Sequence, residues 1–255
     1  MQLIDTHTHL YLPEFDTDRD EVVNRAVSSG IVKMLLPNID IQSVDLMVSA
    51  EVRYPGICYP MVGLHPTSVK DNYLSQLDIL EDLFTKHKFI AIGEIGIDLF
   101  WDKSFLKEQI AAFRRQVAFG IDKGLPVVIH SRESFPEVFS VLDEFKGKYL
   151  KGVLHAFTGD IRDAEKAIEI GFYLGIGGIV TFKNSGLDKV VKEIGPDHLV
   201  LETDSPYLAP APNRGKRNES SYICIINKKL AEIFGMSEEE VASITYNNSA
   251  GLFNL

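Results

Sequence analysis

Short apolar runs alternate with longer amphipathic stretches along the whole chain. Eight of the apolar runs are rich in β-branched residues and predict strands, and each is followed by a stretch with helical periodicity. The predicted strands are residues 3–5, 31–36, 57–62, 89–93, 126–129, 152–154, 172–175 and 199–201. Eight strands that each precede a helix predict an α/β fold, a parallel sheet closed into a TIM (β/α)8 barrel.

The helical stretches carry their own signals. Leu106, Ile110, Phe113, Val117 and Ile121 repeat at helical spacing, and we interpret this apolar stripe as core packing. Residues 134–137 and 237–240 both fit a capping box, which marks the start of a helix. The last helix is predicted at residues 238–246, under the barrel, and the longest irregular segment at residues 204–221. Long loops in a compact domain are often functional.

Composition fits one globular domain that spans residues 1–255. The chain is 45% hydrophobic and 24% charged, and no apolar run approaches the roughly 18 residues that cross a bilayer. No signal-peptide pattern begins the sequence, so we expect a cytoplasmic location and no membrane partner. Cys58 and Cys224 lie far apart in the sequence, so we expect reduced thiols. A net charge of −10 argues against a broad basic surface for nucleic acids, but bound cations and a few arginines still attract phosphate locally.

Polar residues gather where the predicted strands end. In a TIM barrel the active site lies at the carboxyl ends of the strands, so these side chains should converge. His7 and His9 are two positions apart and should share one face of an extended segment. The residues that follow the strands are His7, His9, His65, Glu94, His130, His155 and Asp204.

Imidazoles and carboxylates in this number are sufficient for two divalent ions about 3.5–4 Å apart. We assign His7, His9, Glu94 and Asp204 to one ion, and Glu94, His130 and His155 to the other. Glu94 would bridge the ions; the alternative is a glutamate paired with a core arginine. The mixed ligands suit Zn, Mn, Fe or Ni and would hold Mg more weakly, so the identity of the metal stays open, with Mg, Mn and Zn as the candidates.

Six motifs in this order resemble the TatD family of metal-dependent hydrolases over the whole chain. The motifs are Asp5-Thr6-His7-Thr8-His9-Leu10, Val62-Gly63-Leu64-His65-Pro66, Gly93-Glu94-Ile95-Gly96-Ile97-Asp98, His130-Ser131-Arg132, His155-Ala156-Phe157-Thr158-Gly159 and Glu202-Thr203-Asp204-Ser205-Pro206-Tyr207-Leu208. The later segment Arg214-Gly215-Lys216-Arg217-Asn218 is also similar, although Glu219-Ser220-Ser221 stands where the family usually has a proline. The resemblance implies an amidohydrolase-type barrel with two metals and a DNase activity.

The expected mechanism needs no serine or cysteine nucleophile. Two cations that share Glu94 would lower the pKa of a bound water, and Asp204 could take the proton of that water as general base. His65, Arg132, Arg214, Lys216 and Arg217 are the expected substrate contacts, because arginine suits phosphate and the last three follow Asp204 in the sequence. Each of these residues also has an alternative role. His65 could support a metal ligand, Arg132 could form a salt bridge to a loop acid, and the other three could form a solvated basic turn.

Together with the resemblance, these residues lead us to expect a deoxyribonuclease, a 3′–5′ exonuclease that trims single-stranded or damaged DNA ends. The alternative is an amidohydrolase or esterase that acts on a small carbonyl compound. A third possibility is a non-catalytic metalloprotein that uses the barrel as a binding module. Trp101 and Tyr207 could offer faces on which bases stack, or could simply cap the barrel. Residues 175–178 are glycine-rich but lack the lysine and hydroxyl residue of a phosphate loop, so no nucleotide cofactor is expected.

Overall fold

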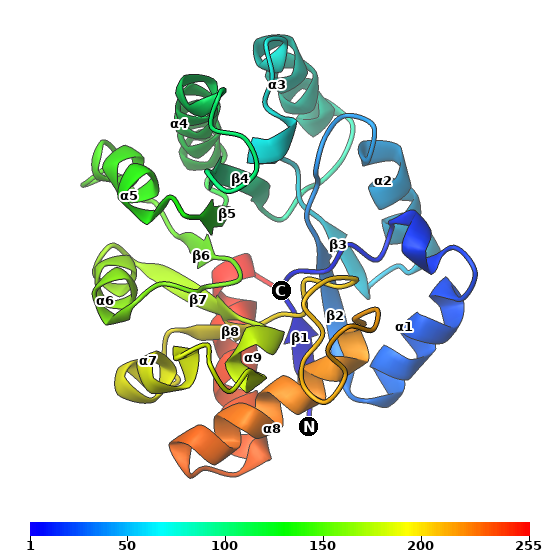
Figure 1. The fold of residues 1–255 in the computed structure, drawn as a ribbon. Helices are drawn as coiled ribbons and strands as arrows, with labels where there is room; N and C mark the ends of the chain where they lie inside the picture. Colours follow the sequence, from blue (N-terminus) through cyan, green and yellow to red (C-terminus); the bar gives the residue numbers. More distant parts are fainter.

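The computed structural model describes residues 1–255 as a ring of parallel strands with helices around it (Figure 1). Strands and helices alternate from the first strand to the eighth helix, and a ninth helix follows. The strands are β1 (Leu3–Asp5), β2 (Ile31–Leu36), β3 (Cys58–Pro60), β4 (Ile92–Asp98), β5 (Val127–Arg132), β6 (Gly152–Leu154), β7 (Phe172–Ile176) and β8 (Leu199–Leu201). The helices are α1 (Arg19–Ser28), α2 (Val44–Arg53), α3 (Tyr73–Asp82), α4 (Leu106–Lys123), α5 (Phe135–Asp143), α6 (Ile161–Glu169), α7 (Leu187–Ile194), α8 (Ile223–Phe234) and α9 (Glu238–Phe253). The predicted TIM barrel is confirmed.

Two parallel sheets make up the ring, one with β1 to β3 and one with β4 to β8. Single bridges join them, from Val62 to Ile92 beyond β3 and from Thr8 to Ser205 beyond β8. The second junction also has a hydrogen bond in which Asp204 N donates to His7 O at 2.9 Å. The barrel therefore closes beside the residues that the sequence places in the site.

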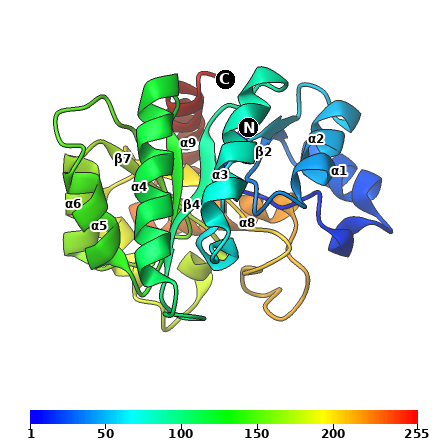
Figure 2. The same ribbon diagram turned by 90° about the horizontal axis from the view of Figure 1, so that it is seen from above.

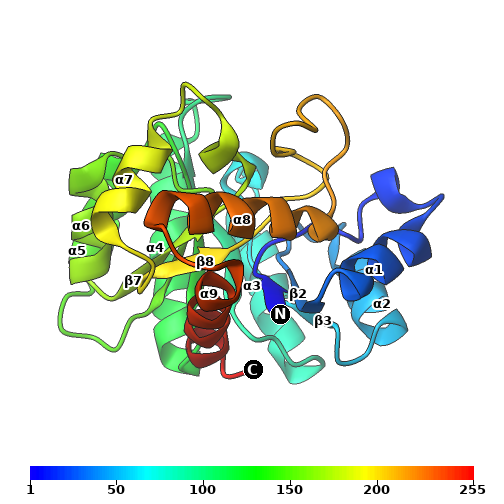
Figure 3. The same ribbon diagram turned by 90° about the horizontal axis from the view of Figure 1, so that it is seen from below.

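The apolar core has two parts because successive strand residues face opposite sides. In β5, Val127 and Ile129 belong to a large cluster that also holds helix residues, whereas Val128 belongs to a smaller cluster inside the ring. Leu252 and Phe253 of α9 join this inner cluster. Figures 2 and 3 show α9 at one end of the barrel and the long loop after β8 at the other. The inside of the barrel is thus apolar at the α9 end, which leaves the opposite end for polar side chains.

The prediction for β4 was wrong in its bounds. The strand covers Ile92–Asp98 rather than residues 89–93, and all seven of its residues are buried. Glycine lets this strand approach β5 closely: a Cβ on Gly96, whose φ is +141°, would lie 2.0 Å from His130 O. Glu94 and His130 therefore lie inside strands, not after them.

Helix ends follow the sequence in one case and not in another. Ser237 forms the predicted capping box: its Oγ accepts from Glu240 N at 3.2 Å, and Glu240 Oε2 accepts from Ser237 N at 2.9 Å. The box predicted at Ser134 is absent, because its hydroxyl donates to Ile97 O at 2.6 Å instead. The last helix also continues past position 246 to Phe253, since its end packs into the barrel.

Two further features can be compared with the sequence. Cys58 and Cys224 are both free, as expected. None of the helices combines the length and the apolar character needed to cross a membrane.

Candidate metal centre

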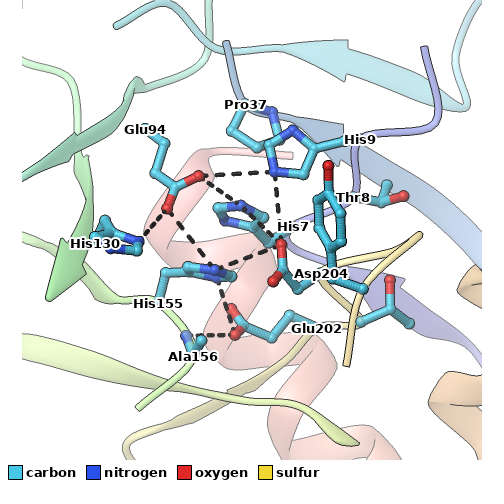
Figure 4. A network of polar contacts seen from close by, with 12 residues as sticks. His7, Thr8, His9, Pro37, Glu94, His130, His155, Ala156, Glu202 and Asp204 are labelled. Carbon is cyan, nitrogen blue, oxygen red and sulfur yellow. Dashed lines mark hydrogen bonds and ion pairs between the residues drawn. The ribbon is translucent and has the colours of Figure 1, made fainter. Parts of the chain in front are cut away.

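Glu94 of β4 lies at the centre of a cluster of imidazoles (Figure 4). Its Oε2 atom is 3.1 Å from His7 Nε2 and 3.7 Å from His9 Nε2. Its Oε1 atom faces a different set, with His130 Nδ1 at 3.0 Å and His155 Nε2 at 3.9 Å. The two oxygens of one carboxylate thus face two separate pairs of histidines, the arrangement that a bridging ligand requires.

Asp204, just beyond β8, faces the same cluster from the other side. Its Oδ1 atom lies 3.5 Å from His9 Nε2, 3.7 Å from His155 Nε2 and 3.8 Å from His7 Nε2. The rings of His7 and His155 stack with centroids 3.3 Å apart. The structure therefore brings together all six residues that the sequence proposed as ligands: four come from beyond strand ends, and Glu94 and His130 lie inside β4 and β5.

The carboxylates of this cluster are ionised, and two of its imidazoles, His7 and His65, are neutral at pH 7. Burial by itself would raise the pKa of Glu94, but the imidazoles of His65 and His7 outweigh it and hold the pKa well below its usual range. Burial is likewise outweighed at Asp204, whose pKa is lowered beside His9. Burial lowers the pKa of His7 and of His65. Anionic oxygens among neutral imidazole nitrogens are a donor set that a divalent cation fits.

The proton of His9 is directed away from the cluster. Its Nδ1 lies 3.0 Å from the hydroxyl of Tyr11, and that hydroxyl donates to Pro37 O at 2.7 Å. The Tyr11 oxygen must therefore accept from His9 Nδ1–H. In a neutral imidazole this leaves the lone pair on Nε2, which points at Glu94 and Asp204.

Two buried carboxylates orient the other pair of imidazoles in the same way. Asp98 Oδ2 lies 2.8 Å from His130 Nε2, and Glu202 Oε1 lies 3.0 Å from His155 Nδ1. Each ring therefore directs its second nitrogen at Glu94. A carboxylate behind a histidine is the usual arrangement around a ligated metal, because it fixes the ring and raises the basicity of the nitrogen that binds.

His65 has the opposite orientation. Its Nδ1 accepts a hydrogen bond from Thr67 N at 3.2 Å, so in the neutral ring the proton sits on Nε2. That Nε2 is 3.5 Å from Glu94 Oε1. His65 is therefore placed as a hydrogen-bond donor toward the centre rather than as a ligand for a cation.

Gly175, near the end of β7, has a packing role at this site. A Cβ on Gly175 would lie 2.2 Å from Glu202 Oε2, so only glycine leaves room for this carboxylate. Glu202 Oε1 also accepts a hydrogen bond from Ala156 N at 2.6 Å. The glycine-rich segment thus makes space for the residue behind His155.

Sequence reasoning assigned no role to Tyr11, Asp98 or Glu202. A signal existed for the two acids, because a carboxylate within or directly after an apolar strand is costly to bury unless it has a partner. The side chains of Asp98 and Glu202 are 2% and 1% exposed. Tyr11 offered no such signal, since a buried tyrosine is common.

A cavity of about 700 Å³ opens over the cluster. Residues of the candidate centre that line it are His9, His65, Glu94, His130, His155 and Asp204. Trp101, Arg132, Tyr207 and Leu208 also line it and are exposed. Arg132 pairs with no carboxylate, and its guanidinium lies 3.7 Å from the centroid of the Phe100 ring. A cation free to meet an anionic ligand therefore stands at the cavity.

The basic residues of the long loop lie outside this cavity. Arg217 forms a two-pronged pair with Asp18, at 2.6 and 2.8 Å, and donates to Glu14 O. The Arg214 guanidinium lies 4.2 Å from the Phe182 ring centroid, and Lys216 is exposed. Arg217 therefore ties the loop to the segment before α1, while Arg214 and Lys216 remain open to solvent.

The comparison with family models decides what kind of protein this is. The model described as TatD related DNase matches residues 4–254. The chain belongs to this family. It is a metal-dependent hydrolase, and the cluster around Glu94 is the part of the molecule that fits metal ions.

Similar proteins agree with this assignment. YabD of Bacillus subtilis, described as an uncharacterized metal-dependent hydrolase, is 39% identical over 254 residues, which cover 99% of each chain. A Pantoea vagans protein named 3′-5′ ssDNA/RNA exonuclease TatD is 32% identical over 260 residues, 99% of this chain and 100% of the other. The crystal structure of YjjV, a TatD homolog from Escherichia coli K12, aligns with a TM-score of 0.93 at 27% identity and covers 99% of this chain and 98% of that one.

Proposed function

We propose that this TatD-family protein is a 3′–5′ exonuclease that hydrolyses the phosphodiester bonds of single-stranded or damaged DNA ends. The observation that carries the proposal is the pairing of two features in one cavity. Glu94 directs its two oxygens at two sets of imidazoles, and Arg132 stands at the same cavity without a carboxylate partner. The name of the Pantoea vagans relative, 3′-5′ ssDNA/RNA exonuclease, supports the same substrate class.

The residues divide into two ligand sets that share Glu94. We assign His7, His9 and Asp204 to the cation beside Glu94 Oε2, and His130 and His155 to the cation beside Oε1. The distances around the two oxygens support this division. Two divalent cations held there would supply hydroxide from water at neutral pH and offset the charge of the phosphate.

The side chains around the cations have separate roles in hydrolysis. Asp204 is ionised and 16% exposed, so its carboxylate can take the proton of the attacking water and pass it to the leaving 3′-oxygen. His65 carries its proton on the nitrogen that faces the centre, so it donates to a phosphate oxygen. The fork of Arg132 suits a second phosphate oxygen. Arg214 and Lys216 would meet phosphates farther along the strand.

The test uses single-stranded DNA with Mg, Mn or Zn and a label on either end. A 3′–5′ exonuclease should release the 3′ label at once as a mononucleotide and convert 5′-labelled strands into a ladder. Glu94→Gln should abolish this cleavage. Glu169→Gln is the matched control, because Glu169 is exposed and forms no ion pair.

Intact DNA under all three metals would overturn the nuclease proposal, and carbonyl esters and amides would then be the substrates to try. Cleavage of 5′-labelled strands from the labelled end would contradict the polarity alone. Normal activity of a folded Asp204→Asn variant would remove Asp204 from the mechanism.

A further inference from the structure

Two exposed aromatic side chains follow β4, and one of them, Trp101, lines the cavity. Trp101, the only tryptophan in the chain, is 70% exposed, and Phe100 is 46% exposed. An indole normally buries most of its surface, so one that lines a cavity and stays exposed is informative. The mechanism proposed above gives it no role.

Arg132 and the two rings form one unit, which we call the aromatic ledge (Phe100, Trp101 and Arg132). The guanidinium carbon lies 3.7 Å from the Phe100 centroid and 5.5 Å from the Trp101 centroid. The two rings meet edge to face, with centroids 4.9 Å apart and planes at 87°. Phe100 thus holds both the cation and the indole, which limits their freedom and prepares a flat apolar face beside a positive charge.

The ledge is connected to the candidate metal centre through β5. Arg132 ends this strand two residues after His130, so the two side chains leave the same face of the sheet. Both residues line the cavity, together with Trp101. A phosphate held at the centre would therefore have an arginine fork beside it and an indole next to the fork.

Arg132 differs from the other cations of this region. Lys70 lies 3.5 Å from Asp102, and Lys103 lies 4.0 Å from Glu133. These acids partly neutralise the lysines, whereas no carboxylate pairs with Arg132. The charge left for an anionic ligand is thus the one stacked against the aromatic rings.

We propose that the aromatic ledge binds the unpaired base of the nucleotide whose phosphate lies at the metal centre. This rests on the proposed nuclease function and deepens it. Bases stack on aromatic faces without regard to sequence, but a paired base must first leave its partner and its stack to reach a ring of the protein, which costs a few kcal/mol, whereas an unpaired base turns freely. The ledge therefore makes the hydrolase select strand ends with an unpaired base, with Trp101 under the base and Arg132 on the phosphate.

The single tryptophan supplies a direct assay, because all tryptophan emission comes from the ledge. The zinc-loaded protein is titrated with a short single strand of DNA whose linkages are phosphorothioates, which slows cleavage. A second strand of equal length lacks the base at its 3′ end. Binding is measured independently by the anisotropy of a dye on the 5′ end. The intact strand should quench the emission of Trp101, and loss of the base should weaken binding by about 5- to 150-fold, the range that one stacked base covers.

Three variants separate stacking from a general effect on binding. Trp101→Ala should bind both strands with the same affinity, the one that the wild type shows for the strand without the 3′ base. Trp101→Phe should keep part of the difference in affinity between the two strands. Tyr149→Ala is the matched control, because Tyr149 is 77% exposed and lies outside the cavity, and it should keep the whole difference. Arg132→Ala should weaken binding of both strands.

Failure of the ledge and failure of the nuclease proposal give different results. If the wild type binds and cleaves DNA but does not distinguish the two strands, and its emission stays constant at saturation, the ledge is not the base site. If the intact strand quenches the emission of Trp101 and binds more tightly than the strand without the 3′ base, but no metal supports cleavage of ordinary DNA, the aromatic ledge is supported as the base site and the nuclease proposal fails.

Discussion

Replacing Glu202 with glutamine should weaken metal binding at His155 while the barrel stays folded. The carboxylate is buried, lies 3.0 Å from His155 Nδ1 and accepts a hydrogen bond of 2.6 Å from Ala156 N. A glutamine oxygen can keep both contacts, because the other oxygen, Oε2, has no hydrogen-bond partner to lose. The main change is the loss of one negative charge behind the imidazole.

Two effects of this charge oppose each other at neutral pH. Burial would lower the pKa of His155, but Glu202 and Glu94 outweigh it and raise the pKa to about 10 in the metal-free protein. Loss of the Glu202 charge therefore weakens the binding of the proton that competes for His155 as well as the binding of the metal. The metal carries twice the charge of the proton, so the variant should bind metal more weakly overall.

Loss of the partner behind a ligating histidine typically lowers metal affinity by about 10- to 100-fold. Because glutamine keeps the hydrogen bond from Ala156 N and the proton on His155 is also held less tightly, we expect the lower end, about tenfold or 1.4 kcal/mol. Glu202→Ala removes the hydrogen-bond acceptor too and should approach 100-fold. The variant should also release fewer protons when it binds metal at pH 7, an effect that a merely structural change would not produce.

The assay is calorimetric titration of metal-stripped protein with Zn at pH 7, in two buffers that differ in ionisation enthalpy. Thermal unfolding of the metal-free variants checks that they fold. Glu169→Gln removes one exposed carboxylate at the end of α6 and is the matched control. A folded Glu202→Gln protein with zinc affinity within about twofold of wild type, and with the same proton release, would refute the role of Glu202 behind His155.

Further predictions follow from other contacts of the site. Glu94→Gln should reduce DNA cleavage by at least about 100-fold, because it removes the charge that both cations share; a folded variant with normal cleavage rates would contradict the bridge. Gly175→Ala should destabilise the protein by about 1–3 kcal/mol in urea unfolding, because the new methyl would lie 2.2 Å from Glu202 Oε2; unchanged stability would show that the carboxylate moves freely. Burial would lower the pKa of His130, but the Asp98 and Glu94 carboxylates raise it to about 9, so the metal-free fold keeps this stabilisation below about pH 6.5 and loses it as the pH rises through about 9. Metal binding at pH 7 should therefore release protons from His130 and His155, and calorimetry that finds no proton release would contradict these charges.

Several parts of the candidate centre could be predicted because they depend on local pattern alone. Apolar runs and helical periodicity repeat eight times, and parallel strands in a barrel bring their carboxyl ends together. His7, His9, His155 and Asp204 follow such strands, so their convergence follows from topology without any knowledge of distances. Glu94 and His130 were found for the same reason, although both lie inside longer strands than expected.

Contacts between distant segments could not be predicted. Arg217 looked like a free cation in a basic loop, but it pairs with Asp18, which lies 199 positions earlier. The absence of a salt bridge at Arg132 is equally invisible in the sequence, because it depends on which acids of other loops come near. Pairing of surface charges is decided by tertiary distances, so the sequence can propose cations but cannot say which of them are free.

The sequence by itself determined the barrel, the family and the set of side chains that converge around Glu94, because periodicity, residue type and motif order can be read along the chain. Only the tertiary structure decided how each imidazole is oriented. Asp98, Glu202 and Tyr11 fix which ring nitrogens face Glu94, and Thr67 makes His65 a donor. The physical reason is that the sequence does not show which hydrogen-bond partner a histidine has. The partner of one ring nitrogen sets where the proton lies, and thus whether the other nitrogen binds a metal or donates a hydrogen bond.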